Sequence, residues 1–582
     1  MNRKWRRLLL FVAVSNALSA IFLTSCGSGG GNSEEEAATE QQSLFAVDTS
    51  VDLREGSINN LTVYITSQCY TKTRADDDSV FNPCYTCHQA PVKPNFLDDS
   101  GLQNELDFAG YALENPFTNL FEDRSARVAA ISDKAILEYI ATDNYQTEDG
   151  TIILAELLGS GLPDNWDLDG DKKWDGYIPD CHFNFDTEGF DRDPESEYTG
   201  WRAFGYYPFL GTFWPTNGST DDVLIRLDTP FRQDEGGQFD LEVYKLNLAI
   251  VEAIVKQTDV DIDPVTEVRY QVDLNDNGVL DEATTIHYKS EDDGSHMSYV
   301  GRARQLLQMG DLKVLGGLYP VGTEFLHSVR YIQPHEDGSI SLAKRMKELR
   351  YARKANWYNY NEIKGVARRE ANERIFNEDA IRSPVGDFER GMRQLGWRYQ
   401  GFIEDRIGNL RPQSREESFF CMGCHYGTGA TMDTVFSFTR KFGHSRFQQG
   451  WYHWSQKGLA NIPEPIREDG HPEYTYYLEQ NRAGDEFRAN DEVISRFFNE
   501  DGSLKADEID ALHDDISLLL FPSRERALML NKAYKVIVED QDFAQGRDAT
   551  VTPVENVHRT VTRLQPTGID TPVAGPGRIG NL

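Results

Sequence analysis

Two short segments of the chain carry the residue types that could do chemistry. Each contains the motif Cys-x-x-Cys-His, as "CYTCH" at 84–88 and as "CMGCH" at 421–425. The chain has only 7 cysteines and 12 histidines in 582 residues, so two units with the same order are not chance. Thiolates and imidazoles bind zinc, and a Cys-x-x-Cys pair is also a redox dithiol. The third chemistry is covalent attachment of a cofactor to both sulfurs, with the histidine as a metal ligand.

The histidine favours the third chemistry, because neither a zinc site nor a redox dithiol needs it directly after the second cysteine. The order is the attachment signature of haem c, and on these two motifs the chain resembles dihaem c-type cytochromes of the bacterial lipoprotein type. The resemblance implies that Cys84, Cys87 and His88 hold one haem, and that Cys421, Cys424 and His425 hold a second, each histidine being the proximal iron ligand. A four-cysteine zinc site and a redox dithiol remain the alternatives.

Short helices are the elements that must position these side chains. On a helix, residues i and i+3 lie on one face and residue i+4 lies beside them. In "SREESFFCMGCH", Ser414 is a candidate N-cap and Glu417 follows three residues later, which is a capping box. At the first motif, Asn82 can cap a helix and Pro83 suits its first position. We therefore expect both motifs on helices.

The sixth position of each iron decides between an electron carrier and an enzyme, because an open position permits peroxide or oxygen chemistry. Downstream of the second motif, His444 and His453 are candidate distal ligands. Met432 is only seven residues past His425, which is too near to cross the haem plane. Either histidine is equally compatible with an ordinary surface or core position.

Two acidic segments resemble calcium loops, in which oxygen ligands at alternating positions wrap the ion. They are "DLDGDKKWDG" at 167–176 and "DLNDNGVLDE" at 273–282. The expected ligands are Asp167, Asp169, Asp171 and Asp175 in the first, and Asp273, Asn275, Asn277 and Asp281 in the second. Position 12, normally a bidentate Glu, is Ile178 or Thr284, so the expected affinity is weak. The alternative is a solvated acidic turn.

Cys69 and Cys181 are left over from the motifs. Outside the cytosol two such cysteines often pair, so the sequence predicts a disulfide between them. Two unpaired buried thiols are the alternative.

The N-terminus has the layout of an export signal. Four basic residues lie within the first seven, an apolar run covers 8–22, and "LTSC" resembles a lipobox ending at Cys26. We expect 1–25 to be a lipoprotein signal peptide, Cys26 to be lipidated, and 26–45 to be a flexible tether. Gly27 after the cysteine favours the outer membrane in such lipoproteins. The expected location is the bacterial cell envelope.

Composition limits the partners and suggests the organisation. A formal net charge of −35 repels nucleic acid and suits redox partner proteins with basic surfaces. The predicted fold is α+β and multidomain, with mainly helical haem-binding regions at 46–160 and 346–582 flanking a turn- and β-rich region at 161–345. Helices are predicted at 132–142, at 239–257 and, in a basic segment that could meet haem propionates, at 343–357. Strands are predicted at 267–271 and 323–332.

The leading hypothesis is an exported dihaem c-type cytochrome that transfers electrons at the cell envelope, with two covalently bound haem c groups and calcium as a further cofactor. The alternative is a dihaem peroxidase- or oxygenase-like enzyme with one open haem site. A surface structural lipoprotein with secondary haems is a third reading.

Overall fold

The computed structural model divides the chain into two units, 1–44 and 45–582. The structure describes residues 45–563 except 75–79, 82–86, 89–92, 97–107, 209–218, 291–295, 378, 380–383, 468 and 482–489. Cys26, Asn82, Pro83 and Cys84 lie outside the described residues. No helix in the described ranges is long and apolar enough to cross a membrane.

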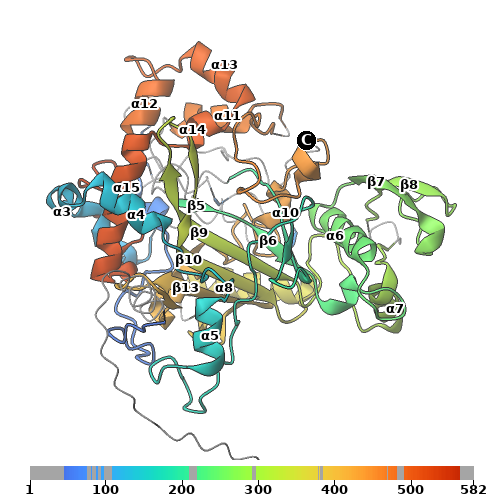
Figure 1. Ribbon diagram of the computed structural model, residues 1–582. Coiled ribbons are helices and arrows are strands. Elements are labelled where there is room, and N and C mark those ends of the chain that lie inside the picture. Colours follow the sequence, from blue (N-terminus) through green and yellow to red (C-terminus); the bar gives the residue numbers. More distant parts are fainter. Residues whose placement is uncertain are drawn as a thin grey trace, which may run out of the picture. The chain divides into compact units, whose positions relative to one another are not determined.

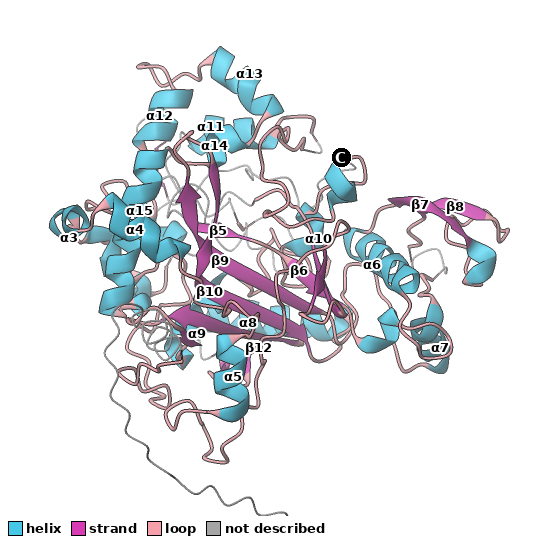
Figure 2. Cartoon of the chain, in the orientation of Figure 1, coloured by secondary structure: helices cyan, strands magenta, loops and turns pink. Residues whose placement is uncertain are grey.

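An antiparallel sheet of ten strands forms the centre of the second unit (Figures 1 and 2). Its strands are β3 (Phe190–Arg192), β4 (Tyr198–Ala203), β5 (Ser219–Asp221), β6 (Leu224–Arg226), β9 (Glu324–Pro334), β10 (Ile340–Lys354), β11 (Val385–Asp387), β12 (Gly391–Gln394), β13 (Trp397–Glu404) and β14 (Leu410–Pro412). The order is β11-β12-β13-β10-β9-β6-β4-β3, with β14 on β13 and β5 on β9. Two small hairpins lie apart from it, β1 (Thr73–Arg74) with β2 (Val80–Phe81) and β7 (Val260–Thr266) with β8 (Glu282–Ile286).

The long strand β10 replaces the basic helix that the sequence predicted at 343–357, so that prediction is wrong. β10 pairs with β9 on one side and with β13 on the other, and this pairing overrides the helix propensity of its Lys, Arg, Glu and Leu residues. Its buried charges have partners: Arg345 lies 2.9 Å from Glu404, and Lys354 lies 2.7 Å from Asp433. The predicted boundary between 345 and 346 falls inside this strand.

Helices surround the sheet. The described α-helices are α3 (Ser125–Ala130), α4 (Asp133–Ala141), α5 (Ile153–Ser160), α6 (Leu241–Lys256), α7 (Gly301–Met309), α8 (Tyr360–Phe376), α9 (Arg415–Cys424), α10 (Ser437–Arg440), α11 (Glu473–Asn481), α12 (Asp491–Phe497), α13 (Ala506–Asp514), α14 (Ser517–Leu520) and α15 (Arg524–Asp540). Short 3₁₀ turns are Ser67–Tyr70, Gly110–Ala112, Thr118–Phe121, Thr229–Arg232, Glu267–Arg269, Phe447–Gly450 and Phe543–Gln545. α4 and α15 pack on β9 and share a buried cluster with it (Figure 1).

Local sequence signals account for several of these elements. Helices α4 and α6 and strand β9 confirm the predictions at 132–142, 239–257 and 323–332. The Asp240 side chain caps α6 by accepting hydrogen bonds from two backbone amides. The predicted strand at 267–271 is wrong, because this segment is the 3₁₀ turn Glu267–Arg269 between β7 and β8. The mixed α+β class is confirmed.

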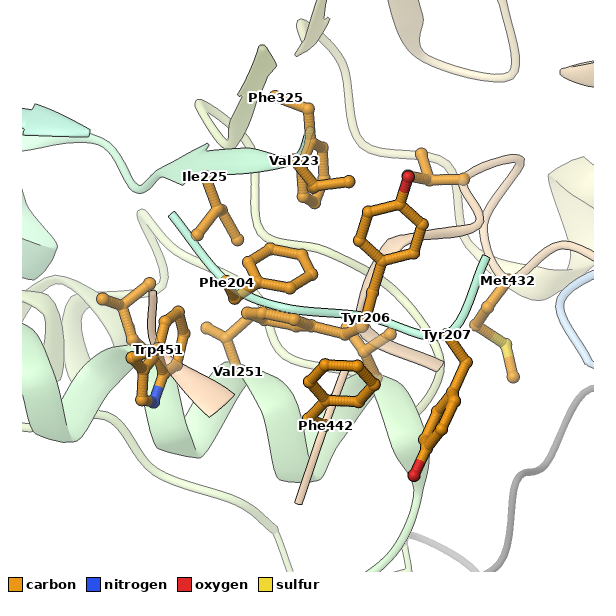
Figure 3. Packing of buried hydrophobic residues seen from close by; sticks show 14 of the residues in the cluster. Phe204, Tyr206, Tyr207, Val223, Ile225, Val251, Phe325, Met432, Phe442 and Trp451 are labelled. Carbon is orange, nitrogen blue, oxygen red and sulfur yellow. The ribbon is translucent and has the colours of Figure 1, made fainter. Parts of the chain in front are cut away.

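An aromatic core lies beside helix α6. Figure 3 shows Phe204, Tyr206, Phe442 and Trp451 grouped near Val251 of that helix. Burying each large apolar side chain stabilises the fold by roughly 1.5–3 kcal/mol. Tyr206 also lines the cavity described below, so the core and the candidate site share a wall.

Candidate functional site

Helix α9 presents the second motif, and its first turn is capped as the sequence predicts. The Ser414 hydroxyl accepts from the Glu417 backbone amide at 3.2 Å, and the Glu417 carboxylate accepts from the Ser414 amide at 2.8 Å. This capping box satisfies two amides that a helix start leaves without partners. The buried guanidinium of Arg411 holds the same carboxylate through two contacts of 2.9 Å. The start of α9 is therefore fixed, and with it the motif one turn later.

The three motif residues Cys421, Cys424 and His425 line one cavity. The cavity has a volume of about 150 Å³ and opens to solvent. α9 and the segment after it form one wall, and the sheet forms the other with Phe325, His327, Val329, Arg350, Ala352 and Tyr399. A flat group bound to both sulfurs and to the imidazole would lie between helix and sheet.

His425 is held in the form that binds a metal. Its Nδ1 donates to the backbone carbonyl of Thr434 at 2.6 Å, which leaves Nε2 as the nitrogen with a lone pair. Burial lowers the pKa of His425 to about 4, so the ring is neutral at ordinary pH. The rings of Tyr399 and Phe436 pack beside the imidazole, with centroids 4.7 and 5.8 Å away.

The two motif cysteines are in an environment that disfavours thiolates. Burial, with a smaller contribution from nearby Cys69, raises the pKa of Cys424 to about 12, and burial also raises the pKa of Cys421. Zinc and redox-dithiol sites both use the thiolate. Among the described residues, one group of at least three His, Cys, Asp or Glu side chains is close enough to hold an ion. It consists of Asp167, Asp169 and Asp171 and includes neither cysteine. Burial therefore favours the neutral thiol at both cysteines.

Three arginines with acidic partners line the same cavity. Arg350, Arg440 and Arg547 line it, and each also pairs with an acid at 2.8–2.9 Å, Glu348 or Glu473. Asp221 faces the cavity as well, and burial raises the pKa of its carboxyl to about 6. Arginines in such a setting bind carboxylates through charge-assisted hydrogen bonds.

The first motif lies against the loop that follows the second one. The backbone carbonyl of Cys87 accepts from the Ala430 amide at 3.2 Å, and the Asn95 amide donates to the Thr428 carbonyl at 3.1 Å. Cys87 and Phe436 both pack against Ala430, and Phe436 also meets the ring of His425 edge-on. Two motifs far apart in the sequence are therefore neighbours in space. Cys84 lies outside the described residues, and so does the predicted helix start at 82–83. Cys87 and His88 are described and lie in a turn and an irregular segment, so the prediction of a helix is wrong for this end of the first motif.

Neither predicted distal histidine faces the cavity of His425, so both assignments are corrected. His453 is 4% exposed, with Nδ1 bonded to the Ser455 hydroxyl at 2.7 Å and Nε2 to the Asp222 carboxylate at 2.9 Å. Both of its ring nitrogens are engaged. His444 lines a different cavity, between α6, β7 and the segment around Lys441.

His327, in the middle of β9, is a cavity residue that the sequence reasoning missed. Its Nδ1 donates to the backbone carbonyl of Asp222 at 2.7 Å. The alternation of side chains along a strand places residues 325, 327 and 329 on one face, and this pattern was readable from the sequence. What the sequence did not show is which helix that face meets.

The first acidic loop carries its own cations. Asp167 is 4% exposed and accepts from the Gly170 and Lys172 amides, as the first ligand of a calcium loop does. Arg390, however, pairs with Asp169 at 2.6 Å and with Asp175 at 3.0 Å. Two of the four expected ligands are thus neutralised by a side chain of the protein.

The second acidic loop folds around Asp273. Its carboxylate accepts from the amides of Asn277 and Gly278 at 3.2 and 2.9 Å, and Gly278 has φ +84°, the left-handed conformation that favours glycine. The Asn277 side chain donates to Asp281 at 3.1 Å. Buried Glu267 holds the loop from outside by accepting from the amides of Leu274 and Asp281. Asn275, the remaining expected ligand, accepts from the Asn277 amide.

The predicted disulfide between Cys69 and Cys181 is not formed, so that prediction is wrong. Cys69 packs in the cluster around Tyr70 and lies close enough to Cys424 to affect its pKa. Cys181 is fully buried elsewhere, where its backbone carbonyl accepts from the Tyr145 hydroxyl.

Comparison with known proteins places the chain among lipoproteins. A family model whose description reads "-like lipoprotein" matches residues 54–511. An uncharacterized lipoprotein of Aquifex aeolicus (strain VF5) is 30% identical over 590 aligned residues, which cover 93% of this chain and 92% of the relative. No solved structure matches the chain. Membership of the dihaem c-type cytochromes, which the motifs suggested, is corrected by these matches, whereas the lipoprotein part of the prediction is confirmed.

Proposed function

Because the chain belongs to this lipoprotein family, and is thus a lipid-anchored protein of the cell envelope, we propose that its body binds two haem c groups and transfers electrons there. The observation that carries the proposal is the convergence of Cys421, Cys424 and His425 on one cavity, with the imidazole fixed by Thr434. Cys26 followed by Gly27 supports anchoring in the outer membrane.

The residues present fit a covalently bound haem. In each attachment the S–H and vinyl C=C bonds are exchanged for a C–S and a C–H bond, so the thiol hydrogen passes to the neighbouring vinyl carbon and no oxidant is required. Cys421 and Cys424 would bind one haem, and Cys84 and Cys87 the other. His425 and His88 would coordinate the two irons. Arg350, Arg440 and Arg547 line the cavity, each paired with Glu348 or Glu473. Bound haem supplies a one-electron couple.

Transfer between two haems is supported by the contact between the motifs. The backbone carbonyl of Cys87 accepts from the Ala430 amide at 3.2 Å, and Phe436, which meets the ring of His425 edge-on, packs against the same alanine. An electron from a donor would enter at one site and leave from the other to an acceptor. The net charge of −35 favours partner proteins with basic surfaces, and the rate of association should fall with ionic strength.

Intact protein from a host with haem c maturation tests the proposal. The mass of the mature chain should exceed that of the polypeptide by two haems, and the reduced protein should show a haem c absorption spectrum. Colourless protein, or a mass without two haems, would overturn the proposal. Carbon monoxide and peroxide distinguish an electron carrier from an enzyme, because both react rapidly only at an iron with an open coordination position. Rapid reaction at one iron would favour a peroxidase- or oxygenase-like activity instead.

We also propose structural calcium at the second acidic loop. Among the described residues, the hydrogen-bond partners of the Asp273 carboxylate are backbone amides, and none is a cationic side chain. Millimolar calcium is expected to raise the melting temperature, since loops of this kind outside cells bind at about 10⁻⁴–10⁻³ M. Asp273→Asn should remove most of the rise, whereas Asp510→Asn, on the exposed side of α13, should keep it. Equal rises in both variants, or equal rises with magnesium, would contradict a specific site.

A further inference from the structure

We propose that His327 is the sixth iron ligand of the haem attached at Cys421 and Cys424, an inference that rests on the proposed function. Nothing in the neighbourhood of the motif in the sequence points to this residue. It lies nearly one hundred positions before the motif and on a strand rather than on a helix.

The two histidines come from the two walls of one cavity. His425 ends helix α9, and His327 lies on β9 of the sheet, between Phe325 and Val329 on the same face. Both histidines line this cavity, together with Tyr399 of β13. A planar group between helix and sheet would have one imidazole on each side.

The chemical state of both rings is the same. Nδ1 of His425 donates to the Thr434 carbonyl at 2.6 Å, and Nδ1 of His327 donates to the Asp222 carbonyl at 2.7 Å. A carbonyl only accepts, so each Nδ1 carries the hydrogen and each Nε2 carries the lone pair. Metal-bound histidines usually donate their other N–H to a carbonyl or carboxylate in this way.

Asp222 is itself fixed, so His327 has a rigid support. The Asp222 carboxylate accepts from the Ser328 amide at 2.6 Å and contacts Nε2 of His453 at 2.9 Å. Asp222 is 1% exposed, and it directly follows β5, which pairs with β9. His453, expected to be a ligand, thus acts one step away, as a positioning residue for the carbonyl that orients His327.

Two histidine ligands would make this iron six-coordinate. Bis-histidine ligation lowers the reduction potential relative to methionine ligation and leaves no open position for peroxide. With His327 as its sixth ligand, this haem would transfer electrons, and any open coordination position would have to be at the other haem.

The test uses the mature holoprotein and the variant His327→Ala. Haem content should stay at two, and the reduced variant should take up one more equivalent of carbon monoxide than the unchanged protein. One set of bis-histidine signals should disappear from the EPR spectrum, and added imidazole should restore it. The matched control is His335→Ala, an exposed histidine just after the end of β9, which should change neither measurement.

A second variant keeps the test decisive if alanine prevents folding. His327→Met retains a ligand of similar reach and should give the near-infrared band of methionine ligation and a higher potential for one haem. Unchanged EPR signals and unchanged carbon monoxide uptake in the folded variants would overturn the assignment of His327 while two haems remained bound. Absence of haem from the unchanged protein would instead overturn the proposed function.

Discussion

Replacing Cys421 and Cys424 by serine is expected to lower the haem content from two groups per chain to one. Serine is close to cysteine in size but its hydroxyl does not form the thioether, so the second haem loses both covalent bonds. His425 and the cavity remain, yet noncovalent haem would be lost during purification under denaturing conditions. Intact-protein mass and the haem absorbance per chain measure the change directly.

The matched control for this double variant is Cys69→Ser. Cys69 is half-buried, as Cys424 is, and acts on the pKa of Cys424, but it belongs to neither motif. This variant should keep both haems. Retention of two covalent haems after loss of Cys421 and Cys424, or loss of a haem from the Cys69 variant, would contradict the assignment of the second motif.

The second large effect is expected from Arg411→Met. The Arg411 side chain is 1% exposed and that of Glu417 is 6% exposed, and the two contacts between them are 2.9 Å long. Methionine keeps much of the volume but leaves a buried carboxylate without its cation. Removing one partner of a buried ion pair lowers the free energy of unfolding by about 3–5 kcal/mol. Urea denaturation of the variant and of the unchanged protein measures the difference.

The appropriate control is an ion pair of the same type on the surface. Arg496 lies 3.0 Å from Glu508, with side chains 40% and 39% exposed, and Arg496→Met should cost less than about 1 kcal/mol. If both variants lost the same small amount, the pair beneath α9 would not be an essential support of the motif.

Local features of the site were readable from the sequence because they depend on neighbours in the chain. The capping box of Ser414 and Glu417 involves residues three apart, and the structure shows both of its hydrogen bonds. Helix α6 and strand β9 follow from the spacing of apolar residues over one element. The placement of both cysteines on one face of α9, with His425 directly after its end, follows from helix geometry.

What could not be predicted depends on contacts between distant segments. β10 has the composition of a helix and becomes a strand because β9 and β13 lie on either side of it. His327 has no marker in its own segment, since its role arises from the face of β9 that meets α9. His453 follows the motif in the sequence and was therefore predicted as a distal ligand, but in the fold it contacts Asp222.

The cavity is closed by segments from opposite ends of the described body. Thr66 and Gln68 line it near the beginning, and Arg547 and Asp548 line it near the end. The cavity is therefore complete only when two segments far apart in the sequence have both folded into place. Under the proposed function, haem would have to reach Cys421 and Cys424 before these segments close over the cavity.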